Sequence, residues 1–201
     1  MLYVFKGIDQ LPDDFIGTCS CFLPKWRLDQ MMVYRLPSDR KLCALAYLIL
    51  VYALKKEGVF YALPEFGYRT EGKPFLSNYQ DIYFNLSHCR NVVVCILSDR
   101  EVGVDVETVF PYDDALAKAV CSDPEYLRVS WSSDPNIQAK NFTELWTRKE
   151  SVVKWRGTGL NCDPREILQD NSPDIPGQGY QISSHYIKTG DFYISICRNS
   201  P

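Results

Sequence analysis

The chain has 201 residues, of which 46% are hydrophobic and 23% are charged, and its formal net charge is -3 at pH 7. This composition is that of an ordinary folded protein, and it excludes disorder, collagen or a coiled coil as a description of the whole chain. Nucleic-acid-binding domains usually carry a basic footprint, so the small negative charge argues against a general nucleic-acid partner. The longest uncharged run, residues 42–54, is too short to span a bilayer.

The cysteines indicate the redox environment of the protein. All eight are scattered along the chain, and no Cys-x-x-Cys pair occurs. Cys43, Cys95 and Cys197 lie within apolar runs, where a reduced cysteine behaves as a small hydrophobic residue. The first residues lack the basic head and the long apolar core of a signal peptide. We therefore expect free thiols, a cytoplasmic location and no association with membranes.

The first strong element in chain order is a long helix around the apolar run. Pro37, Ser38 and Asp39 precede the run as a stop, an N-cap and a first-turn carboxylate, and residues 55–58 supply cations and a terminal glycine. This helix should be the spine of the first half, because it is apolar on nearly all sides. Residues 59–81 are rich in turn formers. Three strand-like runs follow, at 82–86, 92–97 and 102–107.

Helices are expected in the next segment. Ser122 and Glu125 have the spacing of a capping box, with a proline in the first turn, so a helix should begin there. A longer helix is expected over about 139–156, and it should end at Gly157. Two strands are expected to close the chain, at 180–187 and 191–197.

The order of these elements predicts the fold class. Strand runs and helix runs are segregated instead of alternating strictly, which is typical of an α+β fold. A boundary near 100–103 would divide the chain into two halves of ordinary domain size, residues 1–101 and 102–201.

Two carboxylates, two residues apart, lie in the third strand-like run. Asp105 and Glu107 should lie on one face of that strand, with Val104 and Val106 on the other. Carboxylates are hard oxygen ligands suited to Mg²⁺, which usually takes one or two of them together with substrate phosphates. The alternative is a solvated strand face or the end of a strand, and the pair taken alone favours that simpler interpretation.

A second group of polar residues lies on the predicted long helix. Trp146, Glu150 and Lys154 step by four residues and so share one helix face. The alternative is a surface Glu–Lys pair beside a core tryptophan. If Glu150 joins the two strand carboxylates, the motifs together describe three carboxylates and a lysine around a metal-bound phosphate. Lys149 either touches a substrate or packs.

Three motifs occur in a fixed order after Gly72-Lys73-Pro74. They are Phe84-Asn85-Leu86-Ser87-His88, Val102-Gly103-Val104-Asp105-Val106-Glu107, and Trp146 to Lys154 followed by Gly157-Thr158-Gly159-Leu160. In order and spacing they resemble the 4′-phosphopantetheinyl transferases of the Sfp-like (surfactin-synthetase-activating) class. The resemblance implies an enzyme of the holo-[acyl-carrier-protein] synthase type, which transfers the phosphopantetheine arm of coenzyme A to a serine of an apo acyl or peptidyl carrier protein and releases 3′,5′-ADP. It also implies a monomeric pseudo-dimer of two similar α+β halves, with coenzyme A between them.

The resemblance assigns roles to the residues that match these motifs. It implies that Asp105, Glu107 and Glu150 bind Mg²⁺, or alternatively Mn²⁺, together with the diphosphate of coenzyme A. It implies that Lys154 contacts the same phosphates. Glu150, or a water on the metal, is the implied base for the carrier serine, since a serine hydroxyl is a poor nucleophile at neutral pH.

The implied coenzyme A contacts lie in the first half. Ser87 and His88 match the motif that holds coenzyme A, with His88 at the 3′-phosphate. Lys73 and Arg40 are further phosphate contacts by position. Without the resemblance, His88 would more simply be a buried, satisfied histidine. Glu125 matches an acidic position near the metal in some members of the class, and its capping role explains it equally well.

Three other functions fit the sequence less well. A metal-dependent nuclease would carry its glutamate and lysine two residues apart on a strand, whereas here they are four apart in helical sequence. A zinc or Ser–His hydrolase is poorly supported, because the histidines are only His88 and His185, and the neighbours Ser87 and His88 would point to opposite strand faces. A non-catalytic binding relative would be expected to lack an acid, and all three are present.

Overall fold

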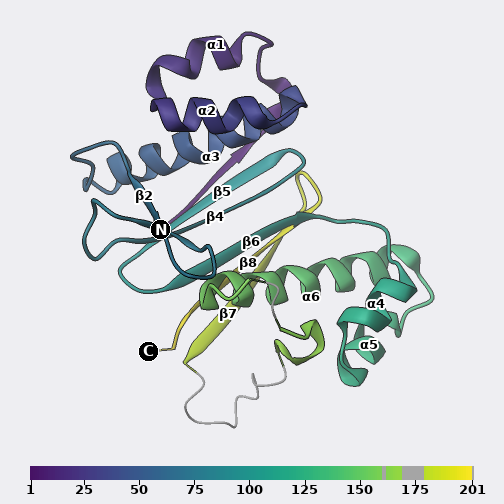
Figure 1. Cartoon of the computed structure of the whole chain (residues 1–201). Coiled ribbons are helices and arrows are strands. Elements are labelled where there is room, and N and C mark those ends of the chain that lie inside the picture. The colour runs from purple at the N-terminus through teal and green to yellow at the C-terminus, as the bar shows by residue number, and fades with distance from the viewer. Residues whose placement is uncertain (160–161, 169–178, 201) are drawn as a thin grey trace.

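The computed structural model describes residues 1–159, 162–168 and 179–200. Leu160, the last residue of the third sequence motif, lies outside these ranges. The described elements form four layers, in the order helix, sheet, sheet, helix (Figure 1). Helix α3 (Pro37–Lys56) covers one outer face, and α6 (Pro135–Arg156) covers the other.

Strands and shorter helices make up the rest of the fold. In chain order they are β1 (Leu2–Lys6), α1 (Phe15–Cys19), α2 (Lys25–Val33), β2 (Phe66–Tyr68), β3 (Pro74–Leu76), β4 (Tyr83–Cys89), β5 (Val92–Ser98), β6 (Val102–Thr108), α4 (Asp114–Val120), α5 (Asp123–Ser130), β7 (Tyr180–Ile187) and β8 (Phe192–Asn199). The mixture of helices and sheets confirms the predicted α+β class. No helix in the described part of the chain is long and apolar enough to cross a membrane.

Both predicted long helices are confirmed. Their first residues differ slightly from the predicted ones, and the residues at the helix ends explain why. Helix α6 begins at Pro135 because the side chain of Asp134 caps its first turn, and it ends at Gly157, whose φ of 74° is left-handed. Helix α3 begins at Pro37, since proline suits the first helical position. The expectation that Ser38 is the N-cap is therefore wrong, because Ser38 lies inside the first turn.

The predicted start of α5 is also confirmed, since Ser122 and Glu125 form both bonds of a capping box. The five predicted strands are present as β4 to β8. Residues 59–81, expected to be turns, also contain the short β2–β3 hairpin. Strand β1, helices α1, α2 and α4 and three short 3-10 helices in the described part of the chain are not among the predicted elements.

Each half contains a three-stranded antiparallel sheet with the same order of strands. The first sheet has the order β1-β5-β4 and the second β6-β8-β7. In both, a strand precedes the long helix, a hairpin follows it, and the last strand is central. This repeated order agrees with two similar halves, while the pseudo-dimer and the division at residues 101 and 102 stay predictions.

The two sheets face each other across an aliphatic core. Val94 of β5, Val104 and Val106 of β6, and Ile194 of β8 are almost completely buried in it. The opposite face of β5 packs on α3, for example through Val93. The valines of β6 thus point away from α6, which confirms the predicted division of this strand into two faces.

Strands β4 and β6 belong to separate sheets, and side chains join them. The Oδ1 atom of Asn85 accepts the backbone N–H of Val104 at 2.9 Å. The hydroxyl of Ser87 accepts the N–H of Val106 at 3.3 Å. Buried backbone donors need partners, and these two bonds supply them at the edge of the second sheet. We call this contact the β4–β6 seam.

Candidate active site

Helix α6 crosses β6 at very close range. Gly103 shares a strand face with Asp105 and Glu107, and a Cβ atom there would collide with backbone atoms of Ser151 and Trp155. Only glycine lets a helix and a strand approach this closely. The approach brings Glu150 and Lys154, which share a face of α6, to the carboxylates of β6.

Three residues predicted for the site are bonded directly to one another. The ammonium of Lys154 donates to Oδ1 of Asp105 at 2.6 Å and to Oγ of Ser87 at 2.7 Å. Ser87 in turn donates to the same Asp105 oxygen at 2.9 Å. Asp105 and Ser87 are 6% and 5% exposed and the side chain of Lys154 is 28% exposed, so this ionic cluster is largely buried. It joins β4, β6 and α6, and the structure thus brings these three predicted residues together.

The pKa values of the two glutamates of the predicted site are shifted by burial and by the charges of this cluster. Burial, followed by repulsion from Asp105 and Glu150, raises the pKa of Glu107 to about 7, and Lys154 opposes this rise. Burial and repulsion from Asp105 also raise the pKa of Glu150, again opposed by Lys154. The three carboxylates therefore share Lys154 as a nearby cation, and together they carry more negative charge than it offsets.

The chemistry of these carboxylates fits a divalent metal ion. Within the described residues, no three His, Cys, Asp or Glu side chains are already gathered closely enough to hold a metal. Oδ1 of Asp105 is bound by the ammonium of Lys154, which acts as its counter-charge. The oxygen donors of Asp105, Glu107 and Glu150 are nevertheless the kind that Mg²⁺ prefers. Their partial burial and mutual repulsion are what a bound cation would relieve.

His88 lies on the opposite face of β4 from Ser87. It pairs with Val93, on the face that packs toward α3, and its side chain is exposed. The alternative of a buried histidine is therefore wrong. Partial desolvation and then Lys154 lower the pKa of His88, while Asp39 and Asp105 oppose them. Asp39 lies in the first turn of α3, so the charge at this helix end acts on the imidazole.

Arg40 follows Asp39 on α3. Its side chain is half-buried, and its Nε donates to the carbonyl of Tyr34 at 2.8 Å. Its predicted contact with a phosphate stays a prediction. Lys73, expected to have the same role, is buried and already bonded to Glu101 and to two backbone carbonyls.

Lys149 and Glu125 form a buried ion pair. The ammonium of Lys149 lies 2.8 Å from Oε2 of Glu125 and 2.6 Å from the carbonyl oxygen of Pro164. The same Glu125 oxygen accepts the N–H of Ser122 in the capping box. Lys149 is therefore a buried structural residue, paired with Glu125. The capping role of Glu125 is confirmed.

A hollow of about 270 Å³ adjoins Lys154. Its wall includes Gly72 and Pro74 as well as Gly157 at the end of α6.

Sequence patterns did not identify Glu101 as a residue near the predicted site. It directly precedes β6, and no local spacing signals that it pairs with Lys73 across 28 residues.

Comparisons with known proteins agree with the motifs. Residues 101–197 match the family model described as the 4′-phosphopantetheinyl transferase superfamily. The predicted resemblance is confirmed. The metal candidates and Lys154 lie inside the matched range, whereas Arg40, Lys73, Ser87 and His88 lie before it.

Several similar proteins are named as 4′-phosphopantetheinyl transferases. The 4′-phosphopantetheinyl transferase gsp of Aneurinibacillus migulanus is 37% identical over 114 residues, 57% of this chain and 45% of the relative. AcpT of Salmonella typhi is 42% identical over 98 residues, 47% of this chain and 50% of the relative. Sfp of Bacillus subtilis (strain 168) is 32% identical over 110 residues, 55% of this chain and 46% of the relative. The chain thus spans about half the length of the curated relatives it matches.

Proposed function

We propose that this chain transfers the 4′-phosphopantetheine arm of coenzyme A to a serine of an apo acyl or peptidyl carrier protein, with Mg²⁺ and with release of 3′,5′-ADP. The observation that carries the proposal is the cluster of Lys154, Asp105 and Ser87 where β4, β6 and α6 meet, with Glu107 and Glu150 near enough for their charges to interact with it. The transferase activity named for the relatives supports the same reaction.

The proposed reaction exchanges one phosphorus–oxygen bond for another. The serine oxygen of the carrier bonds to the phosphorus of the phosphopantetheine arm, and the bond from that phosphorus to the bridging oxygen of 3′,5′-ADP breaks. Glu150 takes the serine proton, because a serine hydroxyl is a poor nucleophile without a positioned base. The ammonium of Lys154 offsets the negative charge that grows on the leaving phosphate.

Asp105, Glu107 and Glu150 are the residues that would hold Mg²⁺ or Mn²⁺. A bound ion of this kind supplies positive charge to the diphosphate. Ser87, His88 and Arg40 complete the proposed site as contacts of coenzyme A. In this proposal His88 faces the 3′-phosphate, beside the first turn of α3.

We also propose an oligomeric state and a cellular location for the enzyme. Because both sheets lie in one chain and meet at the β4–β6 seam, a single copy offers a complete site, and we propose a monomer. We place it in the cytoplasm, where coenzyme A and apo carrier proteins meet. Nucleic acids and membranes are not among its proposed partners.

The test is direct transfer to carrier proteins. The protein is incubated with coenzyme A, Mg²⁺ and a mixed panel of apo carriers, and the carriers are then weighed intact. We expect a gain of one phosphopantetheine arm, which a chelator abolishes. Glu150→Gln should lower the rate by about 100-fold or more, since a positioned base contributes on this order. Glu65→Gln is the matched control, because Glu65 is exposed and lies outside the site.

The opposite outcome would also be informative. If no carrier gains mass while coenzyme A binds measurably, the proposed transfer is wrong for these carriers. The chain would then be better described as a coenzyme A-binding relative without transferase activity.

A further inference from the structure

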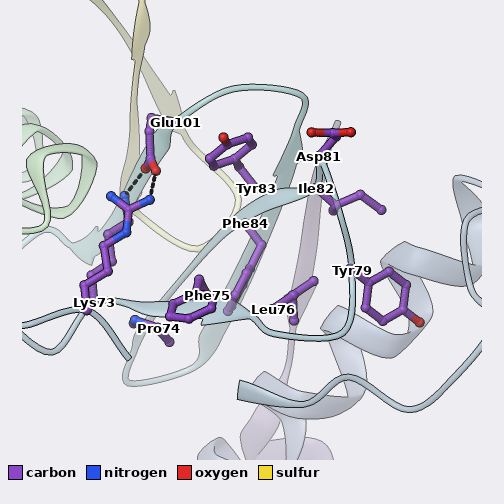
Figure 2. Close-up of a pocket in the computed structure, with 11 residues that line it drawn as sticks. Lys73, Pro74, Phe75, Leu76, Tyr79, Asp81, Ile82, Tyr83, Phe84 and Glu101 are labelled. Atoms are coloured by element: carbon purple, nitrogen blue, oxygen red, sulfur yellow. Dashed lines mark hydrogen bonds and ion pairs between the residues drawn. The ribbon is translucent and has the colours of Figure 1, made fainter. Parts of the chain in front are cut away.

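Lys73 joins three segments that are distant in the sequence. Its side chain is 7% exposed, and its ammonium donates to Oε2 of Glu101 at 2.8 Å. The same ammonium donates to the carbonyl of Trp155 at 3.0 Å and to that of Val102 at 3.3 Å. Figure 2 shows Lys73 directed at Glu101, at one end of a cavity of about 350 Å³. An ammonium has three protons, so these acceptors occupy all of them.

The contact with Trp155 completes the end of α6. The last four carbonyls of a helix have no partner inside the helix and need donors from elsewhere. Trp155 belongs to this last turn, and Lys73 supplies both a donor and a positive charge, which is favourable at a helix C-terminus. Trp155 directly follows Lys154, so the bond holds the backbone next to the lysine of the site.

The stem of Lys73 also packs along this helix end. Gly157, which terminates α6, has a φ of 74°, and a Cβ added there would lie 2.8 Å from Cδ of Lys73. The glycine therefore provides both the left-handed turn and the space for the lysine. The contact fixes where α6 stops relative to the Gly72-Lys73-Pro74 segment.

Glu101 keeps the buried lysine charged. Burial lowers the pKa of Lys73, and the hydrogen bond and charge of Glu101 oppose that change. Glu101 also pairs with Arg69, so it is held from two sides. The pair thus lies between the start of β6, which carries Asp105, and the end of α6, which carries Lys154.

We propose that Lys73 is a positioning residue, which fixes the end of α6 and thereby the place of Lys154, and that its ammonium is not a phosphate contact of coenzyme A. This inference rests on the proposed function, because it assigns a role within the same site. It replaces the role that the resemblance implies for Lys73.

The test compares Lys73→Met with Glu101→Gln in the full chain. We expect the Kd for coenzyme A to stay within about twofold for both variants, while kcat for carrier modification falls by about tenfold or more for Lys73→Met, since small displacements of catalytic groups have effects of this size. Amide exchange over residues 150–157 should become faster in both. Lys188→Met, at an exposed lysine, is the matched control. It should leave the Kd for coenzyme A, kcat and the amide exchange rates unchanged.

Two results would overturn the proposal. In the first, Lys73→Met weakens coenzyme A binding about tenfold while exchange at the end of α6 stays unchanged, which would identify a phosphate contact. In the second, Glu101→Gln tightens coenzyme A binding, which would mean that the released ammonium reaches phosphate. If the native chain transfers nothing, the proposed function fails, whereas the exchange and binding comparisons still decide the role of Lys73.

Discussion

Lys149 shows how a charged residue beside the site is committed to structure. It is 1% exposed and contacts Glu125, whose side chain is 14% exposed. Lys149→Met would leave the glutamate partly buried without its cation. We expect the free energy of unfolding to fall by about 3 kcal/mol, because breaking one side of a buried pair leaves an uncompensated charge. Urea denaturation measures this change.

The control for this prediction is the pair of Lys118 and Asp114. Both side chains are more than half exposed, and exposed pairs contribute little. Lys118→Met should therefore hardly move the urea midpoint. Equal effects of Lys118→Met and Lys149→Met would contradict the structural role of the buried pair.

Exposure of the thiols predicts their reactivity. Cys21 is exposed and Cys162 is half-buried, whereas the other six cysteines are buried. Burial raises the pKa of the Cys121 thiol to about 11 and that of Cys197 to about 12, which removes the reactive thiolate. Brief alkylation of the native protein should label Cys21 and Cys162, and labelling in denaturant should reach all eight. Rapid native labelling of Cys197 would contradict this arrangement.

At the residue scale, local spacing predicted part of the site. The common face of Asp105 and Glu107 follows from the period of a strand, and the common face of Glu150 and Lys154 follows from that of a helix. The bonds from Lys154 to Asp105 and Ser87 span 49 and 67 residues, and no local pattern specifies them. These pairings depend on how α6, β4 and β6 meet in three dimensions.

At the element scale, the crossing of α6 over β6 depends on Gly103. Gly103→Ala places a methyl group against the backbone of α6, and that backbone is less able to move than a side chain. We expect a loss of about 2–3 kcal/mol in unfolding free energy, which is typical of overpacking. Transfer activity should fall as well, because α6 carries Glu150 and Lys154. Thermal or urea unfolding and the carrier assay measure the two effects.

Gly17→Ala provides a matched control. Gly17 lies in α1, and an added Cβ meets nothing within 4 Å. Alanine favours a helix over glycine, so this variant should be unchanged or more stable by about 0.5–1 kcal/mol. If Gly103→Ala is as stable as Gly17→Ala, the proposed close approach is wrong.

The elements that sequence predicted are those with strong local signals. Helices α5 and α6 have caps, and α3 has a long apolar run. Helix α2 lacks such a pattern, since its buried residues are Arg27 and Met31. Because a cation occupies a buried position, the sequence of α2 lacks the apolar periodicity that predicts a helix. In the fold, the rings of Trp26, Tyr47 and Phe66 surround the guanidinium of Arg27.

At the scale of the whole molecule, the β4–β6 seam holds the two sheets together. Asn85→Ala would leave the buried N–H of Val104 without its acceptor. We expect this variant to lose about 1–3 kcal/mol in unfolding free energy, which is the cost of an unsatisfied buried donor. Asn136→Ala, at an exposed position, should change stability by less than about 0.5 kcal/mol. Equal stability of the two variants would exclude the proposed importance of this bond.

The class of the fold could be predicted from the sequence, and its topology could not. Segregated strands and helices predict α+β, because each element has local signals. The placement of β5 and β8 at the centre of their sheets depends on pairing between distant segments, such as Leu2 with Ile96. The letters of the two halves show no repeat, although their strand orders are the same.

The seam has a consequence for how firmly the two sheets are held at a fixed spacing. Strands joined by a backbone ladder keep nearly the same spacing whatever their side chains are. Here Asn85 and Ser87 span the junction with their side chains, so the length of each side chain contributes to the separation of the two sheets, together with the aliphatic core between them. We expect a substitution at either position to shift one sheet relative to the other. The spacing of the two sheets thus depends in part on the identity of two side chains.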